Sequence, residues 1–342
     1  MGRLRIAAIR CWPRRSYAYA SAAIAATITS GVPSMPNANQ SSVKSAQGYK
    51  ADDRNQSILV YVNGEFCSRD SACVSIFDSG FVCGDGVWEG IRLVNGRLIE
   101  LDEHLERLYS GAKFISLDIG LSKRELEQLI WQTLHKNKMT DGVHIRLMIT
   151  RGRKATPNQD PRFVIGGPTI VIVPEYKVRD PLSFTRGISL HTSTFRCSTP
   201  DVFDLQINSH SRLNLIQALV QAIAAGADEA LMLDPNGFVA SCNSTNFFVV
   251  RRGELWTSSG RYSFKGITQK TIMRIAKEAG ITVFAGDFTL SQAYSADEAF
   301  VTGTLGGITP VSTIDGRTIG HGESGTMTKT LLRLYEKYLQ GT

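Results

Sequence analysis

Three segments of this 342-residue sequence combine residue types that suit the binding of an anion. His104-Leu-Glu-Arg-Leu-Tyr109 carries Arg107 on an amphipathic stretch, Gly266-Ile-Thr268 opens a stretch with helical periodicity, and residues 301–310 are rich in glycine and threonine. Arginine side chains and the free backbone amides of a turn or helix N-terminus are groups that bind phosphate. Each segment alone also has an ordinary explanation: a solvated arginine, a threonine N-cap or a common glycine-rich loop.

The order and residues of these segments resemble the class IV, or fold-type IV, pyridoxal-phosphate (PLP) aminotransferases. That family includes the branched-chain and D-amino-acid aminotransferases and aminodeoxychorismate lyase. Gly84-Asp-Gly-Val-Trp-Glu-Gly-Ile-Arg92 is similar to the Phe-Glu-Gly-Ile-Arg run of the branched-chain enzymes, and Ile149-Thr-Arg-Gly152 is like the D-amino-acid enzymes and the lyase. The resemblance runs from about residue 58 to the C-terminus. It implies a two-domain α/β (α+β) fold with PLP between the domains, and a homodimer.

The resemblance also implies roles for individual residues, in one group that holds the cofactor and a second that contacts the substrate. The cofactor group is Arg107, Gly266, Ile267, Thr268, Gly303, Thr304, Ser241 and Asn246. The substrate group is Trp88, Arg92, Leu305 and Gly306. In the first group Arg107, the Ile267 and Thr268 amides and Thr304 would face the phosphate. In the second, the Leu305 and Gly306 amides would face the substrate carboxylate.

The catalytic lysine of the family has no counterpart here. No lysine occurs between Lys177 and Lys265, and the segment that should carry it reads Asn208-Ser-His-Ser-Arg-Leu-Asn214, with Arg212 at the expected position. Ser211 and Asn208 are alternative placements, and neither is a lysine. Arginine keeps its charge, with a pKa above about 12, so it can neither form the Schiff base nor shuttle a proton. Loss of a positioned general base costs about 10²–10⁴ in rate.

Two further departures concern the cofactor ring and the substrate. Ser241 stands where the family has the glutamate that keeps the pyridine nitrogen protonated, and a neutral hydroxyl would weaken the electron sink. The loop at residues 153–161 lacks the Arg-x-His pair that binds the α-carboxylate in D-amino-acid aminotransferases. Lys265, beside the phosphate-binding segment, is the nearest replacement lysine in motif terms, although it is better explained as a surface lysine at a helix start.

Three functions follow. The first is a PLP-dependent transaminase acting on an amino acid with a 2-oxo acid acceptor, most like the branched-chain enzymes. The second is a catalytically impaired PLP-binding homologue, because Arg212 replaces the Schiff-base lysine. The third is an enzyme like 4-amino-4-deoxychorismate lyase, which also needs the lysine. The small-molecule partners would be an amino acid and a 2-oxo acid.

The net charge of +7 does not indicate a nucleic-acid partner. Residues 1–50 hold seven basic and no acidic residues, and the remainder has 31 of each, so the basic charge belongs to the N-terminal segment.

The Arg-, Ala- and Ser-rich start suggests a mitochondrial or plastid transit peptide; the alternatives are a disordered tail of a cytoplasmic protein or a true start at Met35. The sequence contains no run of 18 or more apolar residues, so it predicts no membrane-spanning helix. The six cysteines and six histidines show no metal-binding spacing.

The periodicity predicts three parts: residues 1–55 without a fold, a small α/β domain at 56–175 and a larger α/β domain at 176–342. In the small domain we expect strands at 58–62, 91–94, 97–99, 143–150 and 169–173 and helices at 101–115 and 122–136, with Ser122 and Glu125 spaced as a capping box. Residues 174–181 read as a linker. In the larger domain we expect strands at 188–195, 229–234, 246–251, 254–257, 281–284 and 298–302 and helices at 213–225, 268–280 and 323–339. Few alternating βα units argue against a Rossmann fold.

Overall fold

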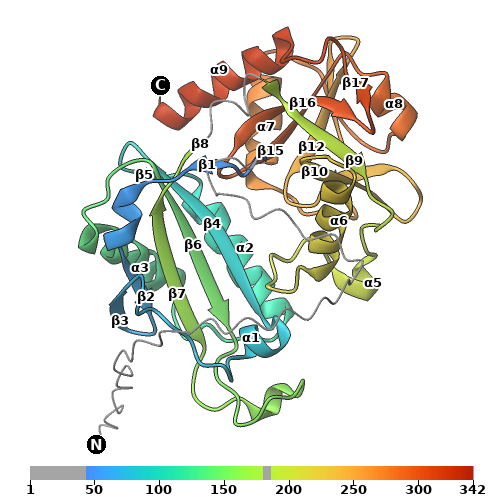
Figure 1. Cartoon of the computed structure of the whole chain (residues 1–342). Helices are drawn as coiled ribbons and strands as arrows, with labels where there is room; N and C mark the ends of the chain where they lie inside the picture. The colour runs from blue at the N-terminus through green and yellow to red at the C-terminus, as the bar shows by residue number, and fades with distance from the viewer. Residues whose placement is uncertain (1–43, 180–185, 342) are drawn as a thin grey trace, which may run out of the picture. The chain divides into compact units, whose positions relative to one another are not determined.

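The computed structural model describes residues 44–179 and 186–341, all of which belong to one compact unit formed by residues 40–342 (Figure 1). Its described strands form two large sheets and one small sheet. The small sheet pairs β1 (Tyr49–Lys50) with β8 (Val178–Arg179) in antiparallel fashion. The predicted transit peptide lies outside the described residues.

The first large sheet is antiparallel, with strands in the order β3-β2-β7-β6-β4-β5. On β6 the residues at odd positions, such as Val143 and Ile145, are buried, whereas His144 and Arg146 between them point to the opposite face. The six strands are β2 (Leu59–Val62), β3 (Glu65–Ser68), β4 (Gly86–Val94), β5 (Arg97–Leu98), β6 (Val143–Thr150) and β7 (Thr169–Tyr176).

Two helices cover the apolar face of this sheet, α2 (Leu101–Phe114) and α3 (Lys123–Lys136). Their buried leucines and isoleucines recur at helical spacing and share one core with β4 and β6. The predicted capping box is confirmed, since Ser122 and Glu125 bond each other's backbone amides. The shorter helices of this half are η1 (Asp53–Ser57), α1 (Ser79–Cys83) and η2 (Pro161–Phe163).

The second large sheet is mixed, in the order β11-β10-β9-β16-β15-β12-β13-β14, with β17 paired to β16. The pairs β9/β10, β9/β16 and β13/β14 are parallel. The nine strands are β9 (Ile188–Thr192), β10 (Glu229–Leu233), β11 (Val239–Cys242), β12 (Asn246–Arg251), β13 (Glu254–Thr257), β14 (Val283–Ala285), β15 (Glu298–Gly303), β16 (Gly307–Ile314) and β17 (Arg317–Thr318).

Helices surround the second sheet and bury its apolar side chains in three clusters. The helices are α5 (Pro200–Phe203), α6 (Leu213–Ala224), α7 (Ile267–Glu278), α8 (Leu290–Tyr294) and α9 (Thr326–Gln340). Helices α7 and α9 share a core with β12, β15 and β16. Within the described residues, no helix is long and apolar enough to cross a lipid bilayer.

Several elements differ from the prediction. The segment 1–55, expected to have no fold, contains β1 and the start of η1 within its described residues, and the expected linker at 174–181 holds the end of β7 and all of β8. Strands β11 and β16 were not predicted, because glycine, serine and Pro310 made both segments read as turns. The pairing of β16 with β9 begins at Val311, one residue after Pro310. The missing N–H of Pro310 therefore removes no hydrogen bond between β16 and β9.

Candidate active site

A cavity of about 490 Å³ is lined by residues from both large sheets, and its volume suits a small-molecule ligand. Strands β4 and β6 and helix α2 contribute from the first sheet's half. The loop before α6, strands β11 and β12, the start of α7 and the turn between β15 and β16 contribute from the other. Both halves of the chain therefore meet at one site.

The structure brings the predicted phosphate-binding segments together in this cavity. Gly266 is the N-cap of α7, and Ile267 and Thr268 follow it, so the positive end of the helix dipole faces the cavity. Gly303 and Thr304 line the same cavity from the turn between β15 and β16. Glycine is required at 266, because a β-carbon there would lie 2.0 Å from the Oδ1 of the buried Asn246.

Arg107 lines the cavity and is held by a buried carboxylate. Its Nε and Nη2 donate to Glu89 Oε1 at 2.7 Å and Oε2 at 2.6 Å, and its Nη1 donates to the Lys265 carbonyl at 3.0 Å. His104 Nδ1 lies 2.7 Å from Glu89 Oε2. Burial alone would raise the pKa of Glu89, but the hydrogen bonds from Arg107 and His104 outweigh it and lower that pKa. Glu89 thus stays charged and fixes the Arg107 guanidinium.

The loop before α6 places Arg212 and Asn208 at the cavity and turns Ser211 away from it. Ser211 Oγ donates to the Gly84 carbonyl at 3.1 Å. Arg212 Nε donates to the Ser209 carbonyl at 2.9 Å, and Nη2 donates to Asn208 Oδ1. Burial, together with the nearby charges of Arg146 and Arg107, lowers the pKa of Arg212 to about 10. A guanidinium with this pKa remains protonated at neutral pH.

Among the described residues, Lys177 is the single lysine that lines the cavity. Its Nζ forms an ion pair with Glu175 Oε2 at 2.8 Å and lies 4.7 Å from the centre of the Tyr49 ring. The side chain of Lys265 lies instead against Gly260, where its Cγ and Cε would be 3.4 Å from an added β-carbon. The replacement lysine suggested by the motif therefore lies outside the cavity, and sequence reasoning missed Lys177.

Ser241 and Asn246 line the cavity next to each other. Ser241 Oγ donates to the Thr245 carbonyl at 2.8 Å, and Asn246 Nδ2 donates to the Phe264 carbonyl at 2.7 Å. A buried carboxyl, Glu229, lies close by but does not line the cavity. It accepts bonds from Thr245 Oγ1 at 2.8 Å and the Ala46 amide at 3.2 Å.

A cationic wall that the sequence analysis did not predict completes the cavity. The guanidinium carbons of Arg146 and Arg212 lie 3.7 Å and 5.3 Å from the centre of the Trp88 ring. Burial lowers the pKa of Arg146, and burial with the adjacent charges of Lys177 and Arg146 keeps His144 neutral by lowering its pKa well below the usual value. The alternation of polar and apolar residues on β6 was the signal that could have identified His144 and Arg146.

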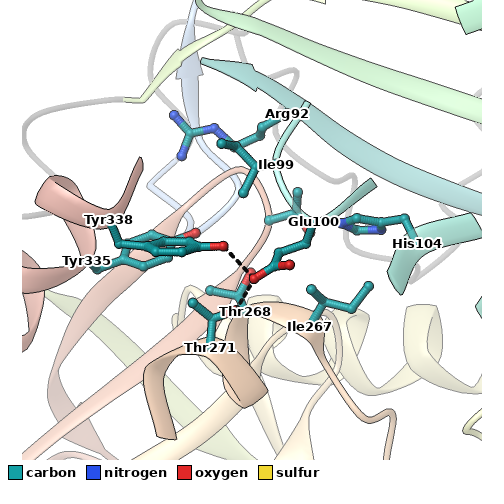
Figure 2. Close-up of a pocket in the computed structure, with 10 residues that line it drawn as sticks. Arg92, Ile99, Glu100, His104, Ile267, Thr268, Thr271, Tyr335 and Tyr338 are labelled. Carbon is teal, nitrogen blue, oxygen red and sulfur yellow. Dashed lines mark hydrogen bonds between the residues drawn. The ribbon is translucent and has the colours of Figure 1, made fainter. Parts of the chain in front are cut away.

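Two predicted substrate residues lie apart from this cavity. Arg92 is on the same face of β4 as Trp88 but lies four residues further along the strand. Its side chain lines a separate cavity of about 10 Å³, together with Glu100, Tyr335 and Tyr338 (Figure 2). Gly306 packs against Ala46, and its carbonyl accepts a bond from Arg179 Nη1 at 2.7 Å. Leu305, by contrast, lines the larger cavity together with Trp88.

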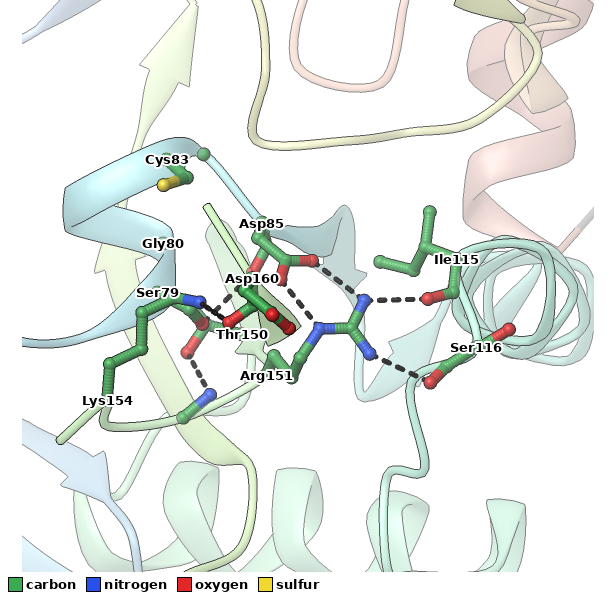
Figure 3. Close-up of polar contacts among 12 residues, drawn as sticks. Ser79, Gly80, Cys83, Asp85, Ile115, Ser116, Thr150, Arg151, Lys154 and Asp160 are labelled. Atoms are coloured by element: carbon green, nitrogen blue, oxygen red, sulfur yellow. Dashed lines mark hydrogen bonds and ion pairs between the residues drawn. The ribbon is translucent and has the colours of Figure 1, made fainter. Parts of the chain in front are cut away.

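The run at residues 149–152 serves a structural purpose away from the cavity. Arg151 Nε and Nη2 donate to Asp85 at 2.6 and 2.9 Å, and the same guanidinium donates to the carbonyls of Ile115 and Ser116 at the end of α2 (Figure 3). Nearby, Lys154 is 1% exposed and its Nζ donates to the Asp160 carbonyl at 3.1 Å. Arg151 thus ties the end of β6 to α2 and to the turn that precedes β4.

Comparisons with known proteins identify the family. The family model described as amino-transferase class IV matches residues 86–314. The putative branched-chain-amino-acid aminotransferase of Methanocaldococcus jannaschii is 41% identical over 275 residues, which cover 80% of this chain and 93% of that protein. The chain therefore belongs to the class IV aminotransferases, and the predicted family is confirmed.

Other relatives widen the range of activities in the family. Branched-chain-amino-acid aminotransferase-like protein 2 of Arabidopsis thaliana is 37% identical over 290 residues, covering 84% of this chain and 51% of that protein, so the chain spans about half the length of that relative. A D-alanine aminotransferase of Listeria monocytogenes is 32% identical over 275 residues, covering 80% of this chain and 93% of that protein.

Among solved structures, a branched-chain amino acid aminotransferase with pyridoxamine 5′-phosphate matches with a TM-score of 0.76 and 31% identity, covering 83% of this chain and 95% of that one. The predicted α/β fold of type IV is confirmed, and so is PLP as the cofactor of the class. The residues of the cavity fit the phosphate end of PLP, because helix α7 and the Gly303–Thr304 turn supply amides and Arg107 supplies a cation. They do not offer its aldehyde a lysine in the loop before α6.

Proposed function

We propose that this chain is a PLP-dependent aminotransferase, most like the branched-chain enzymes, that moves an amino group between an amino acid and a 2-oxo acid. One observation supports this best: the phosphate-binding segments, a cationic wall and a lysine all line the same cavity. Amino and 2-oxo acids are carboxylates, and a cavity lined by Lys177 and by Arg146 and Arg212 over the Trp88 ring favours an anionic substrate.

The side chains divide the work between cofactor and substrate. Arg107, fixed by Glu89, and the α7 N-terminus would hold the cofactor phosphate, and Ser241 with Asn246 would lie beside the cofactor ring. When bound, PLP supplies an electron sink for charge that develops at the substrate α-carbon. Arg146 and Arg212 would orient the substrate carboxylate. Trp88 supports both guanidinium groups through its ring.

Lys177 is the residue to which we assign the primary amine of the reaction. The reaction needs a group that can lose and regain a proton near the substrate, and arginine at 212 cannot do so. The Lys177 side chain is 15% exposed, and its Nζ is oriented by Glu175 and the Tyr49 ring. Burial would raise the pKa of Glu175, but Lys177 and Arg69 outweigh it and lower that pKa, so Glu175 can receive a proton only transiently.

The visible spectrum of the protein with PLP, followed by borohydride reduction and peptide mapping, tests this function. We expect borohydride to fix PLP on the peptide that contains Lys177, and Lys177→Ala to lose the label. Adding Arg212→Lys to the Lys177→Ala variant should restore labelling at position 212, because that substitution recreates the lysine of the family. A free-aldehyde spectrum, no label in the unsubstituted protein and loss of PLP on dialysis would contradict the proposed function.

The contrary result favours a second candidate, a protein that binds PLP through its phosphate alone. The observation in favour of it is Arg212, whose Nε and Nη2 are both engaged by the loop before α6, so the family's lysine position is filled by a fixed cation. In that case Arg107→Ala would still weaken PLP binding, and no residue would carry the label.

A further inference from the structure

Residues 44–50, here called the strap, cross the cavity although they precede the family match at residues 86–314. Ala46 is 4% exposed, and its amide donates to Glu229 Oε1 at 3.2 Å. Lys44 Nζ lies 3.3 Å from Asp228 Oδ2. At the other end of the strap, Tyr49 and Lys50 form β1 and pair with β8. The strap is therefore attached to the rest of the chain at both ends.

Two side chains of the strap, Gln47 and Tyr49, line the cavity. The Tyr49 ring contacts Lys177, as described above. Gln47 lies beside the turn between β15 and β16, since a β-carbon on Gly303 would be 2.8 Å from Gln47 Nε2. This turn holds Thr304 and Leu305, which also line the cavity. The Gln47 carboxamide thus lies in the cavity beside this turn.

The Gln47 carboxamide has no hydrogen-bond partner among the described residues, whereas its backbone amide donates to Ser45 Oγ at 3.1 Å. The backbone is therefore fixed while the side chain keeps its donor for another molecule. A primary amide has two N–H donors, and a carboxylate accepts such bonds strongly because its oxygens are charged. Lys177, which contacts the Tyr49 ring of the strap, and Arg146 line the same cavity and favour an anion in it.

We propose that Gln47 is a substrate-binding residue whose Nε2 donates to a carboxylate of the bound amino or 2-oxo acid, at the Gly303–Leu305 turn. This inference rests on the proposed function, since it assumes that an amino-acid substrate enters the cavity beside the cofactor. The Leu305 amide of this turn is expected to face the substrate carboxylate, and Tyr49 of the strap contacts Lys177. Thr304 of the same turn is expected to face the cofactor phosphate, so substrate binding and cofactor binding have to be measured separately.

Binding of two ligands separates these roles. Pyridoxamine 5′-phosphate carries the cofactor alone, and N-(5′-phosphopyridoxyl)-L-glutamate carries the cofactor joined to an amino acid. We expect Gln47→Ala to weaken the conjugate about tenfold, the loss of one bond to a charged group, and to change affinity for pyridoxamine 5′-phosphate less than about twofold. Gln47→Glu should weaken the conjugate further, because it places a negative charge against the carboxylate. Gln56→Ala, an exposed glutamine on η1, is the matched control and should change neither affinity.

Each result decides between specific alternatives. Equal losses for both ligands in Gln47→Ala and Gln47→Glu would assign the strap a structural role and overturn the inference. Unchanged affinity for the conjugate in Gln47→Ala would overturn it as well, while the proposed function would stand. An unsubstituted protein that binds neither ligand would overturn the proposed function, and this inference with it.

Discussion

At the residue scale, the Glu89–Arg107 pair carries most of the specific geometry of the site. Glu89 is fully buried, accepts from Arg107 at two oxygens and lies within bonding distance of His104. One guanidinium is thereby held at the cavity with a fixed orientation. The same pair makes Arg107 structural as well as functional, so a simple alanine substitution disturbs two properties at once.

We predict that Arg107→Ala reduces PLP affinity by about 10- to 100-fold, because charge-assisted hydrogen bonds to phosphate are lost. It should also lower thermal stability, since Glu89 is left buried without its partner. Titration of PLP followed by absorbance measures the first effect, and thermal denaturation the second. In the double variant Arg107→Ala, Glu89→Gln we expect stability to recover while affinity stays low. Recovery of both, or unchanged PLP retention in Arg107→Ala, would contradict the assignment of Arg107 to the phosphate.

The residues of the phosphate-binding segments could be predicted from sequence because each is a short local pattern, such as Gly266-Ile-Thr268 at the start of a helix. Lys177, Gln47 and Tyr49 could not. They reach the site through long-range contacts, for example the bond between the Ala46 amide and Glu229, which are 183 residues apart. Arg92 lines the smaller cavity rather than the one that holds Trp88, because the pattern gives the face of β4 but not the distance along it.

At the element scale, amphipathic periodicity predicted the long helices and most strands to within a few residues. Strand β16 was missed because Gly306 and Gly307 stand at its start and Pro310 lies within it, although tertiary pairing with β15 fixes it as a strand. Helix α3 could be placed closely because its capping box is a local signal. The division into domains near residue 175 stays a prediction, as does the homodimer, for which the exposed Leu213 and Ile216 on α6 offer an apolar surface.

Two arginine–aspartate pairs allow a test of what holds the elements of the first half together. The Arg151 side chain is 17% exposed and joins Asp85, Ile115 and Ser116, whereas the Arg162 side chain is 87% exposed and, among the described residues, bonds only Asp160. We predict that Arg151→Ala lowers the free energy of unfolding by about 2 kcal/mol, because Asp85 loses its partner in a partly buried place. Arg162→Ala, the control, should leave the free energy of unfolding unchanged, since exposed pairs contribute little.

Urea denaturation of both variants at neutral pH measures these changes. Arg151 does not line the cavity, so PLP affinity of the folded variant should equal that of the unsubstituted protein. Equal stability of the two variants would mean that the Arg151 bonds do not hold α2 to the sheet. A loss of PLP affinity in Arg151→Ala without a loss of stability would place Arg151 in the site instead.

At the scale of the whole molecule, Glu229 connects the second sheet to the strap and makes stability depend on pH. Burial raises the pKa of Glu229 to about 7, and the bonds from Thr245 and Ala46 offset only part of that effect. Asp228 adds to the rise through its negative charge, and Cys242 is the adjacent buried thiol. The ordinary pKa of the carboxyl, 4.5, applies in the unfolded chain.

Between pH 4.5 and about 7 the folded protein keeps the Glu229 proton that the unfolded chain has lost, so this group favours folding most at low pH and loses that contribution as pH rises. The full change corresponds to about 3 kcal/mol. We predict that Glu229→Gln removes it. Urea unfolding at pH 5 and pH 8 should show a smaller fall in stability for the variant than for the unsubstituted protein. The same fall in both proteins would show that Glu229 titrates normally.

The contact between Gly306 and the strap limits which residues related sequences can carry at this position. A β-carbon at 306 would lie 2.2 Å from the Ala46 carbonyl, a distance that no backbone atom accepts. Glycine at this position and the presence of the strap are therefore linked: a related chain that keeps the strap must keep glycine there, and a chain that lacks the strap is free to carry a side chain. Covariation between the N-terminal extension and a residue about 260 positions away is the evolutionary signature that this packing leads us to expect.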